Sequence, residues 1–331
     1  MNARGTGAVL RATGMAVPER VMTNREFEEM VDTSDEWITT RTGIKERRIC
    51  AEGQNTADLA AEAARKALEE AGLDPLDVDV IILSTATQDH LLPSTACEAQ
   101  AILGADGAAA FDVSAACAGW LYGTMLADGL LRSGAHATVL VIGAEKMSAI
   151  VDYTDRTTCV LFGDGSGAAV YQLGDGDGAG LIATHMQTDG SLARLLWRPA
   201  GGAAMPSTEE TREKRLEYVK QEGRELFRNA VVSMADSSRT VLDRAGLDVD
   251  DVDLVVPHQA NIRIIEAVAK RLDVEMDRVF VNIDRYGNTS SASIPICLDE
   301  IRREGIAGPG HTILMTAFGG GLAWGSALLR L

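Results

Sequence analysis

The sequence is poor in several residue types that would mark a special class of protein. Only 5% of its 331 residues are aromatic, and its 5 cysteines include no CxxC pair. A disulfide framework and a cysteine-bound zinc site are therefore disfavoured, no metal is expected, and a reducing cytoplasm is the expected compartment. Lysine and arginine number 31 against 48 acidic residues, and the resulting net charge of −17 argues against broad nucleic-acid binding.

Long apolar runs that would target or cross a membrane are also missing. The segment 1–14 has no apolar stretch long enough for a signal and is expected to form a first strand. The longest uncharged run, 312–329, reaches 18 residues, but the three consecutive glycines 319–321 interrupt it midway. We predict two short buried strands joined by a glycine turn, and no membrane association.

Short β-branched runs alternate with alanine-rich segments along most of the chain. Buried strands are predicted in the runs that start at Val78, Ala137 and Asp253. A helix is predicted from Thr56 to the residue before Gly72, which stands at the expected C-cap position. Strands that alternate with helices predict an α/β protein with a parallel or mixed sheet covered by helices. The charged segment 207–244 is expected to be mostly amphipathic helix.

An internal echo indicates duplication. AGLDPLDVDVII, starting at Ala71, recurs as AGLDVDDVDLVV at Ala245, with an offset of 174 and seven of twelve positions identical. A second echo relates LFGDGSGAAV at Leu161 to AFGGGLAWGSAL at Ala317. Similar helix–turn–strand junctions could produce one such match, but two in the same order favour a duplicated domain. We place the join near 174–180, which gives halves 1–174 and 175–331.

One thiol stands at a strand-to-helix junction. In FDVSAACAGWLYG a predicted strand, 111–113, passes through small residues to Cys117 and then into a helix. There the helix dipole and free N–H groups are expected to favour the thiolate, and the small neighbours would admit an acyl substrate. The alternative is a buried core cysteine, as we expect for Cys97, Cys159 and Cys297.

Two polar residues at other element junctions are candidate partners for this thiol. His258, in VVPHQANIRI, lies just beyond a predicted strand, at the sheet edge where α/β proteins bind ligands. Asn288, in YGNTSSASIP, stands before a predicted helix of small residues. Taken alone, His258 could be a surface residue and Asn288 a turn or capping residue.

These motifs, together with VDTSDEWITTRTGI at Val31 and AFGGGLAWGSAL at Ala317, resemble β-ketoacyl-[acyl-carrier-protein] synthase III from end to end. The resemblance implies a thiolase-like fold, with two βαβαβαββ halves in a five-layer α-β-α-β-α arrangement, and a homodimer. It also implies an acyltransferase that initiates fatty acid synthesis by decarboxylative condensation. Its substrates would be a short acyl-CoA and malonyl-acyl carrier protein (ACP), with no permanently bound cofactor.

The resemblance assigns roles to the three candidate residues. Cys117 would form an acyl-enzyme from acyl-CoA. His258, as a neutral imidazole donating from Nε2, and Asn288 would then stabilise the enolate left when malonyl-ACP loses CO₂. The backbone N–H groups of Cys117 and Gly320 would hold the oxyanion of the condensation step.

Four further residues match the family's CoA-binding positions, namely Thr33, Trp37, Arg41 and Arg156. The Trp37 indole and the Arg156 guanidinium would enclose the adenine ring, and Arg41 would contact phosphate. The four-residue spacing of Trp37 and Arg41 would put both on one helical face. Alternatively, Thr33 with Glu36 would be a helix capping box and nothing more.

An acidic carrier protein needs a basic docking patch on this acidic chain. Arg263, Lys270 and Arg271 follow His258 at spacings that share one helical face. The resemblance implies that Arg228 and Arg224, which match family positions, join them. The alternative is an ordinary solvated basic face.

The acyl pocket departs from the family pattern in ways that leave the preferred acyl chain open. Leu92 stands where a phenylalanine of the neighbouring subunit often closes the pocket, Trp120 stands where phenylalanine is usual, and Phe318 is a third expected lining residue.

Three other functions compete with the synthase. They are a related thiolase-fold enzyme of secondary metabolism, a Cys–His–Asn hydrolase, and an inactive homologue that serves as a subunit partner.

Overall fold

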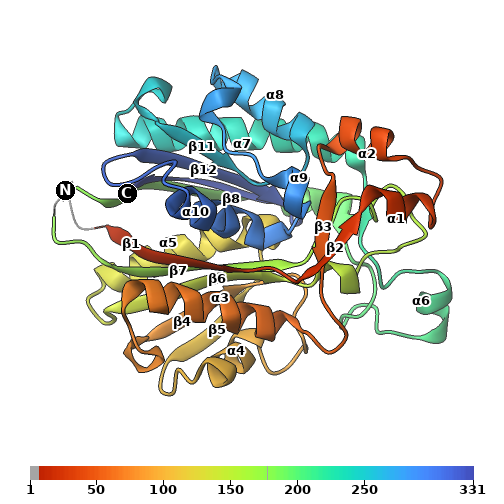
Figure 1. Ribbon diagram of the computed structural model, residues 1–331, viewed down its shortest axis with the longest axis horizontal. Helices are drawn as coiled ribbons and strands as arrows, with labels where there is room; N and C mark the ends of the chain where they lie inside the picture. Colours follow the sequence, from red (N-terminus) through yellow and green to blue (C-terminus); the bar gives the residue numbers. More distant parts are fainter. Residues whose placement is uncertain (1–6, 177) are drawn as a thin grey trace.

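The computed structural model describes residues 7–176 and 178–331, most of whose strands form two stacked sheets with helices between and outside them (Figure 1). The first sheet has five strands in the order β1-β7-β6-β4-β5. Its strands are β1 (Ala8–Ala16), β4 (Val80–Ser84), β5 (Ala109–Val113), β6 (Thr138–Glu145) and β7 (Gly165–Leu173). Strand β4 pairs in parallel with β5 and β6, whereas β7 runs antiparallel to β6 and β1.

The second sheet has four strands in the order β11-β12-β13-β8. They are β8 (Gly180–Thr188), β11 (Leu254–Pro257), β12 (Thr312–Gly319) and β13 (Ala323–Arg330). The predicted pair of buried strands around the glycine turn is therefore confirmed, as β12 and β13. The expected first strand is confirmed as β1, while residues 1–6 of that segment lie outside the described residues.

Six long helices complete five layers (Figure 1). They are α3 (Thr56–Ala71), α4 (Thr95–Leu103), α5 (Gly119–Arg132), α7 (Gly223–Ala245), α8 (Ile262–Leu272) and α10 (Ser293–Arg303). Helices α3 and α4 cover the outer face of the first sheet, α7 and α8 cover that of the second, and α5 and α10 lie between the sheets. This α-β-α-β-α order is the thiolase-like fold that the motifs predict.

Helix α3 shows how local sequence sets these boundaries. Asn55 caps its N-terminus in a capping box with Asp58, and Gly72 ends it in the left-handed conformation, with φ of 68°. Its alanines face the first sheet, and most of them are fully buried. The predicted helix is confirmed at both ends.

The duplication extends through the core with the offset of 174. Strands β6 and β12 correspond residue for residue, and so do the 3₁₀ turns η2 (Ala116–Ala118) and η7 (Ser290–Ala292), which lead into α5 and α10. The first residues of the two turns, Ala116 and Ser290, both have positive φ, 45° and 49°. The counterpart of β5 is reduced to a single bridge between Val255 and Val279.

The second sequence echo does not align equivalent residues. Phe162 lies in the connection before β7, whereas Phe318 lies within β12. The difference arises because the β6–β7 connection runs from 146 to 164, whereas only residues 320–322 join β12 to β13.

Smaller elements flank the two halves. Near one end of the molecule lie β2 (Arg20–Thr23), α1 (Asn24–Glu28), α2 (Asp35–Thr42), β3 (Glu46–Ile49) and α9 (Ile283–Tyr286). The others are β9 (Leu196–Trp197), α6 (Glu209–Glu213), β10 (Lys220–Gln221), η1 (Pro75–Asp77), η3 (Met147–Ala149), η4 (Gly190–Leu195), η5 (Val249–Asp251) and η6 (Met276–Arg278). The segment 207–244 is mostly helical as predicted, in α6 and α7, and residues 214–222 between them form a loop and the short strand β10. Among the described residues, no helix is long and apolar enough to cross a membrane.

Candidate active site

Cys117 occupies the predicted junction between strand and helix. It lies in η2, between β5 and the first turn of α5, and only 9% of its surface is exposed. Its Sγ lies 3.4 Å from Oγ of Ser290, which belongs to the equivalent turn of the other half. The thiol is therefore placed where the two halves of the chain meet.

The expectation that this position favours the thiolate is wrong for the free protein. Burial raises the pKa of the Cys117 thiol to about 12, and its hydrogen bond to Ser290 Oγ lowers this pKa only in part. Among the described residues no cation lowers the pKa of this thiol, and the imidazole of His258, which lines the same cavity, is neutral at pH 7. Cys117 therefore rests as a thiol at neutral pH.

His258 follows the last residue of β11 and is almost fully buried. Burial lowers the pKa of its imidazole to about 3, so the ring is uncharged at neutral pH. Its Nδ1 lies 2.6 Å from Oγ of Ser293, and this hydroxyl also accepts the N–H of Gln259 at 3.3 Å. Because Ser293 Oγ accepts from Gln259, its own proton is available to donate to Nδ1. An Nδ1 that accepts this hydrogen bond favours the tautomer with the ring proton on Nε2.

Asn288 is held by its backbone and by one side of its amide. Its N–H donates to Leu161 O at 2.8 Å, and its carbonyl accepts from Gly163 at 3.1 Å. Its Oδ1 accepts the N–H of Ser290 at 2.8 Å. Because Oδ1 is engaged in this way, Nδ2 is left as the group that can donate to a ligand.

One cavity of about 170 Å³ collects these side chains. Cys117, His258 and Asn288 all line it, as the sequence predicts. Most of the remaining wall is apolar, and it includes Leu161, Phe162, Leu196, Leu226, Phe227, Met234, Ile264 and Phe318. A thiol and two neutral hydrogen-bond donors therefore share an apolar site in which developing negative charge would be stabilised.

The glycine turn after β12 lies against the nucleophile. A Cβ on Gly319 would come within 2.6 Å of the Cys117 nitrogen, so only glycine fits there. A Cβ on Gly320 would lie 3.7 Å from that of Ala116, so this residue also lies beside the Cys117 turn. Cys117 and Gly320, whose N–H groups are predicted to hold the oxyanion, therefore lie close together.

Trp37, Arg41 and Arg156 form a cluster outside this cavity. As their spacing predicts, Trp37 and Arg41 share a face of α2, with the guanidinium 5.7 Å from the ring centroid. Arg156 stacks on the same indole at 5.4 Å and donates to Asp32 O at 2.6 Å. Next to Arg156, the carbonyl of Thr157 accepts a hydrogen bond from Gln221, a cavity-lining residue.

The alternative interpretation of Thr33 as a capping residue is wrong. Helix α2 begins at Asp35, and its N-cap is Ser34, whose Oγ accepts the N–H of Trp37. Thr33 precedes this cap, and its buried Oγ1 has no hydrogen-bond partner among the described residues.

The five candidate cations for carrier docking lie on two exposed helix faces. Arg224 and Arg228 flank the cavity-lining Phe227 on α7, and Arg228 is 3.8 Å from Glu225. Arg263 is exposed in the first turn of α8, beside a residue that lines the cavity. Lys270 and Arg271 are exposed at the far end of α8, roughly two turns away.

The expected acyl-pocket residues are not brought together. Phe318 lines the cavity, but Trp120 packs within the core, where its Nε1 donates to Val141 O at 3.4 Å. Trp120 is turned inward because α5 lies between two sheets and buries this side. Leu92 is 88% exposed on a loop and does not line its own chain's cavity.

The five cysteines are all free thiols. Cys159 and Cys297 are buried as predicted, but Cys97 is exposed and was wrongly expected to be a packing residue. It lies in the first turn of α4, where its Sγ is 3.6 Å from Ala110 O of the edge strand β5, and this contact leaves the residue exposed. No group of three or more potential metal ligands is found among residues 7–176 and 178–331.

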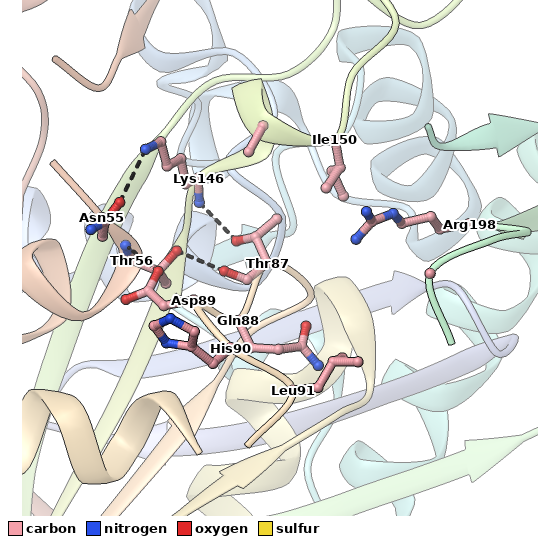
Figure 2. Close-up of a pocket in the computed structure, with 12 residues that line it drawn as sticks. Asn55, Thr56, Thr87, Gln88, Asp89, His90, Leu91, Lys146, Ile150 and Arg198 are labelled. Atoms are coloured by element: carbon pink, nitrogen blue, oxygen red, sulfur yellow. Dashed lines mark hydrogen bonds between the residues drawn. The ribbon is translucent and has the colours of Figure 1, made fainter. Parts of the chain in front are cut away.

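Figure 2 shows a second, larger cavity of about 460 Å³. It is lined by polar side chains at the ends of α3, β4 and β6, among them Asn55, Thr87, Asp89 and Lys146. The exposed Leu91 lies at its rim, next to Leu92.

Sequence reasoning missed Ser290, Ser293 and Glu145. The two serines lie in the quoted YGNTSSASIP run and contact Cys117 and His258. Glu145 is a fully buried acid at the end of β6, and the available signal was a charge that closes an otherwise apolar strand.

Known proteins are similar to this chain over most of its length. The sequence matches the family model for 3-oxoacyl-[acyl-carrier-protein (ACP)] synthase III over residues 111–190 and the model for its C-terminal part over 242–331. A β-ketoacyl-[acyl-carrier-protein] synthase III of Caldanaerobacter subterraneus subsp. tengcongensis is 50% identical over 323 residues, covering 98% of this chain and 97% of the relative.

Solved structures give the same result. The crystal structure of 3-oxoacyl-[acyl-carrier-protein] synthase III from Aquifex aeolicus VF5 is similar with a TM-score of 0.91 and 50% identity, covering 98% of this chain and 100% of that chain. The priming β-ketosynthase of the R1128 polyketide pathway has a TM-score of 0.90 at 34% identity, with 100% and 98% covered.

The fold and the cavity thiol define a thiolase-fold acyltransferase. The similarity over nearly the whole chain shows further that it belongs to the β-ketoacyl-[acyl-carrier-protein] synthase III family, whose reaction is the initiating condensation of fatty acid biosynthesis.

Proposed function

We propose that this enzyme condenses a short acyl-CoA with malonyl-ACP through an acyl-Cys117 intermediate. The observation that carries the proposal is the shared cavity in which Cys117 faces two neutral donors, His258 and Asn288. In the first half-reaction Cys117 Sγ attacks the acyl-CoA thioester, the carbon–sulfur bond to CoA breaks, and the thiol proton leaves with CoA. The products are the acyl-enzyme and free CoA.

The second half-reaction uses the two donors. Malonyl-ACP loses CO₂, and negative charge develops on its thioester oxygen, which His258 Nε2 and Asn288 Nδ2 would hold. Because both groups are uncharged donors already fixed by Ser293 and Ser290, little reorganisation is needed as the charge grows. The carbanion then attacks the acyl carbonyl, and the N–H groups of Cys117 and Gly320 hold the oxyanion. Collapse breaks the bond to Cys117 Sγ and releases 3-oxoacyl-ACP, and the expelled thiolate takes up a proton from water.

We assign CoA recognition to Thr33, Trp37, Arg41 and Arg156. Support comes from the stacking of both guanidinium groups on Trp37 and from the link between the Arg156 loop and the cavity wall. An adenine ring would enter between the Trp37 indole and the Arg156 guanidinium, and Arg41 would meet the phosphates.

We assign ACP docking to the exposed cations around the cavity mouth. Arg263, Arg224 and Arg228 lie on the elements that line the cavity, which supports a role close to the incoming thioester. Lys270 and Arg271 would extend this basic surface along α8.

We infer a homodimer from the first sheet's free edge. Among the described residues β5 pairs only with β4, and Phe111 on it is 38% exposed. Leu91 and Leu92 are 79% and 88% exposed on the neighbouring loop. An unpaired strand beside exposed leucines fits a second copy of this chain, whose Leu92 would then reach the acyl pocket of its partner.

Three further assignments concern the domain boundary, the cellular location and the pathway. The halves would be 1–174 and 175–331, and five unpaired thiols support a cytoplasmic location. The 34% identical polyketide priming enzyme keeps a secondary-metabolite pathway as the second candidate.

One experiment tests the function directly. The enzyme is incubated with a panel of acyl-CoAs and malonyl-ACP, and the products are identified by mass spectrometry. Formation of 3-oxoacyl-ACP and CoA supports the proposal, and the preferred primer distinguishes the two pathways. Release of free acid without malonyl-ACP would instead indicate a hydrolase.

A further inference from the structure

Glu145 is a fully buried carboxyl group beside the active site that the mechanism above does not use. It ends β6 and joins three segments of the chain. Its Oε2 accepts from Thr85 Oγ1 at 3.2 Å, from the Ala86 N–H at 3.0 Å and from Thr87 Oγ1 at 2.8 Å. Its Oε1 lies 2.8 Å from Oγ of Ser291 and 3.3 Å from that residue's N–H.

No cation pairs with this carboxyl group among the described residues. The ammonium group of Lys146, the next residue in the sequence, donates instead to Gln54 O at 2.7 Å and to Asn55 Oδ1 at 3.3 Å, and Figure 2 shows the contact with Asn55. A buried carboxylate without a counter-charge is costly, and burial accordingly raises the pKa of Glu145.

The hydrogen-bond pattern accounts for a proton on this group. The Ser291 hydroxyl has one proton but faces two acceptors, Ser84 O at 2.9 Å and Glu145 Oε1 at 2.8 Å. If Glu145 carries a proton on Oε1, it donates to Ser291, and Ser291 donates to Ser84. Every contact then has one donor and one acceptor, while Oε2 remains free to accept its three bonds.

The segment that Glu145 holds is the one that serves the catalytic centre. Ser291 directly follows Ser290, whose Oγ lies 3.4 Å from Cys117 Sγ. The N–H of Ser290 also fixes the Asn288 amide, at 2.8 Å. Ser290 has a positive φ of 49°, which a non-glycine residue keeps only where its surroundings hold it.

We propose that Glu145, as an uncharged carboxylic acid, is a positioning residue that holds Ser290 and Asn288 in place against Cys117. The kinetic part of this inference rests on the proposed condensation. The charge state does not, because it can be measured without either substrate.

The kinetic test compares Glu145→Gln with Glu145→Ala. The amide of glutamine can donate to Ser291 and accept the three bonds from 85–87, so E145Q should condense within about twofold of wild type. E145A removes both functions and should lose about 10²-fold in condensation, the scale of a small misplacement of reacting groups. Thermal unfolding confirms that each variant is folded. An E145Q enzyme as impaired as E145A, or wild-type condensation by folded E145A, would overturn the proposal.

The charge is tested by infrared difference spectroscopy of wild type against E145Q at neutral pH. A protonated carboxyl group has a C=O stretching band that a carboxylate lacks, and this band shifts in D₂O. Because we infer an uncharged group, the difference spectrum should contain this band. Carboxylate bands in its place would overturn the inference even if the enzyme proved to catalyse another reaction.

Glu300 provides a matched control. It is equally buried but is ion-paired with Arg285, at 2.8 and 2.9 Å. Glu300→Gln leaves that guanidinium without its counter-charge and should lower the unfolding temperature, whereas E145Q should not. Equal losses of stability in the two variants would contradict an uncharged Glu145.

Discussion

The turns that carry Cys117 and Ser291 share a backbone and differ in what faces them. The two residues are 174 positions apart, each in the middle of a 3₁₀ turn that opens a helix between the sheets. Gly319, at the end of β12, faces Cys117, whereas Glu145, at the same place in β6, faces Ser291. The turn of Cys117, the open turn, therefore faces a cavity. In the turn of Ser291, the closed turn, the side chain of Glu145 occupies the equivalent space.

This difference shows that duplication supplies the backbone twice but the active site once. Strand β11 is followed by His258, and the equivalent position in β4 is Ser84, whose buried Oγ has no hydrogen-bond partner among the described residues. Gly319 and His258 in one half therefore correspond to Glu145 and Ser84 in the other. The first pair lies at the reaction site, and the second pair lies at a purely structural contact.

The largest effect should come from removing the nucleophile from the open turn. Cys117→Ala should abolish both acyl-enzyme formation and condensation, because no thiol remains to accept the acyl group. Decarboxylation of malonyl-ACP should persist through His258 and Asn288. The intact mass after incubation with acyl-CoA measures acylation, and full condensation by this variant would exclude Cys117 as the nucleophile.

Removing either hydrogen-bond donor of the open turn's cavity should give the next largest effect. His258→Ala and Asn288→Ala should each lower the rate of condensation by roughly 10²–10³, the usual cost of losing one oxyanion donor. The rate of acylation by acyl-CoA should stay near wild type. Rapid-quench assays separate the two half-reactions, and wild-type condensation in both variants would disprove the enolate-binding role.

Partly closing the open turn tests the comparison itself. Gly319→Ala would place a methyl group 2.6 Å from the Cys117 nitrogen. We expect condensation to fall by about 10²-fold and stability to fall by about 1–3 kcal/mol.

The matched control is Gly129→Ala within α5, where no atom lies within 4 Å of the added Cβ. This variant should keep its activity and gain about 0.5–1 kcal/mol. Equal behaviour of the two variants would show that the space beside Cys117 is not needed.

The buried imidazole predicts a dependence of stability on pH. The pKa of His258 is lowered to about 3 in the folded protein, whereas an unfolded histidine titrates near roughly 6.5. The unfolded state therefore binds the extra proton first, so stability is complete above about pH 6.5 and falls towards pH 3, by up to about 1.4 kcal/mol per unit. Urea unfolding at several pH values measures this, and the slope should be smaller in a folded His258→Gln variant.

The smallest effect should appear at the mouth of the open site. Arg263→Glu should raise the KM for malonyl-ACP several-fold and reduce its salt dependence, while acylation by acyl-CoA stays unchanged. Arg65→Glu, on the exposed face of α3, is the control and should leave both half-reactions intact. Equal loss in both half-reactions of the Arg263 variant would indicate a folding defect instead.

Local signals predicted the fold well where one residue decides the backbone. Gly72 ends α3 as expected, and the glycines after β12 make the expected turn. The cap of α2 was misplaced by one residue because Thr33 and Ser34 are equally good caps by composition. The orientation of Trp120 depends on which sheet covers α5, and the raised pKa of the Cys117 thiol depends on burial from both halves. Neither could be read from nearby residues.

The stacking of Arg156 on Trp37 has a consequence for turnover. If this pair is the adenine slot, the slot closes on itself when empty, and any nucleotide must first break a contact worth roughly 0.5–1 kcal/mol. Acyl-CoA and spent CoA bear the same penalty, roughly two- to fivefold in affinity. The acyl donor loses little, because its acyl group is trapped covalently on Cys117. Free CoA has no such trap, so the self-closing slot weakens its binding and limits product inhibition before the carrier protein arrives.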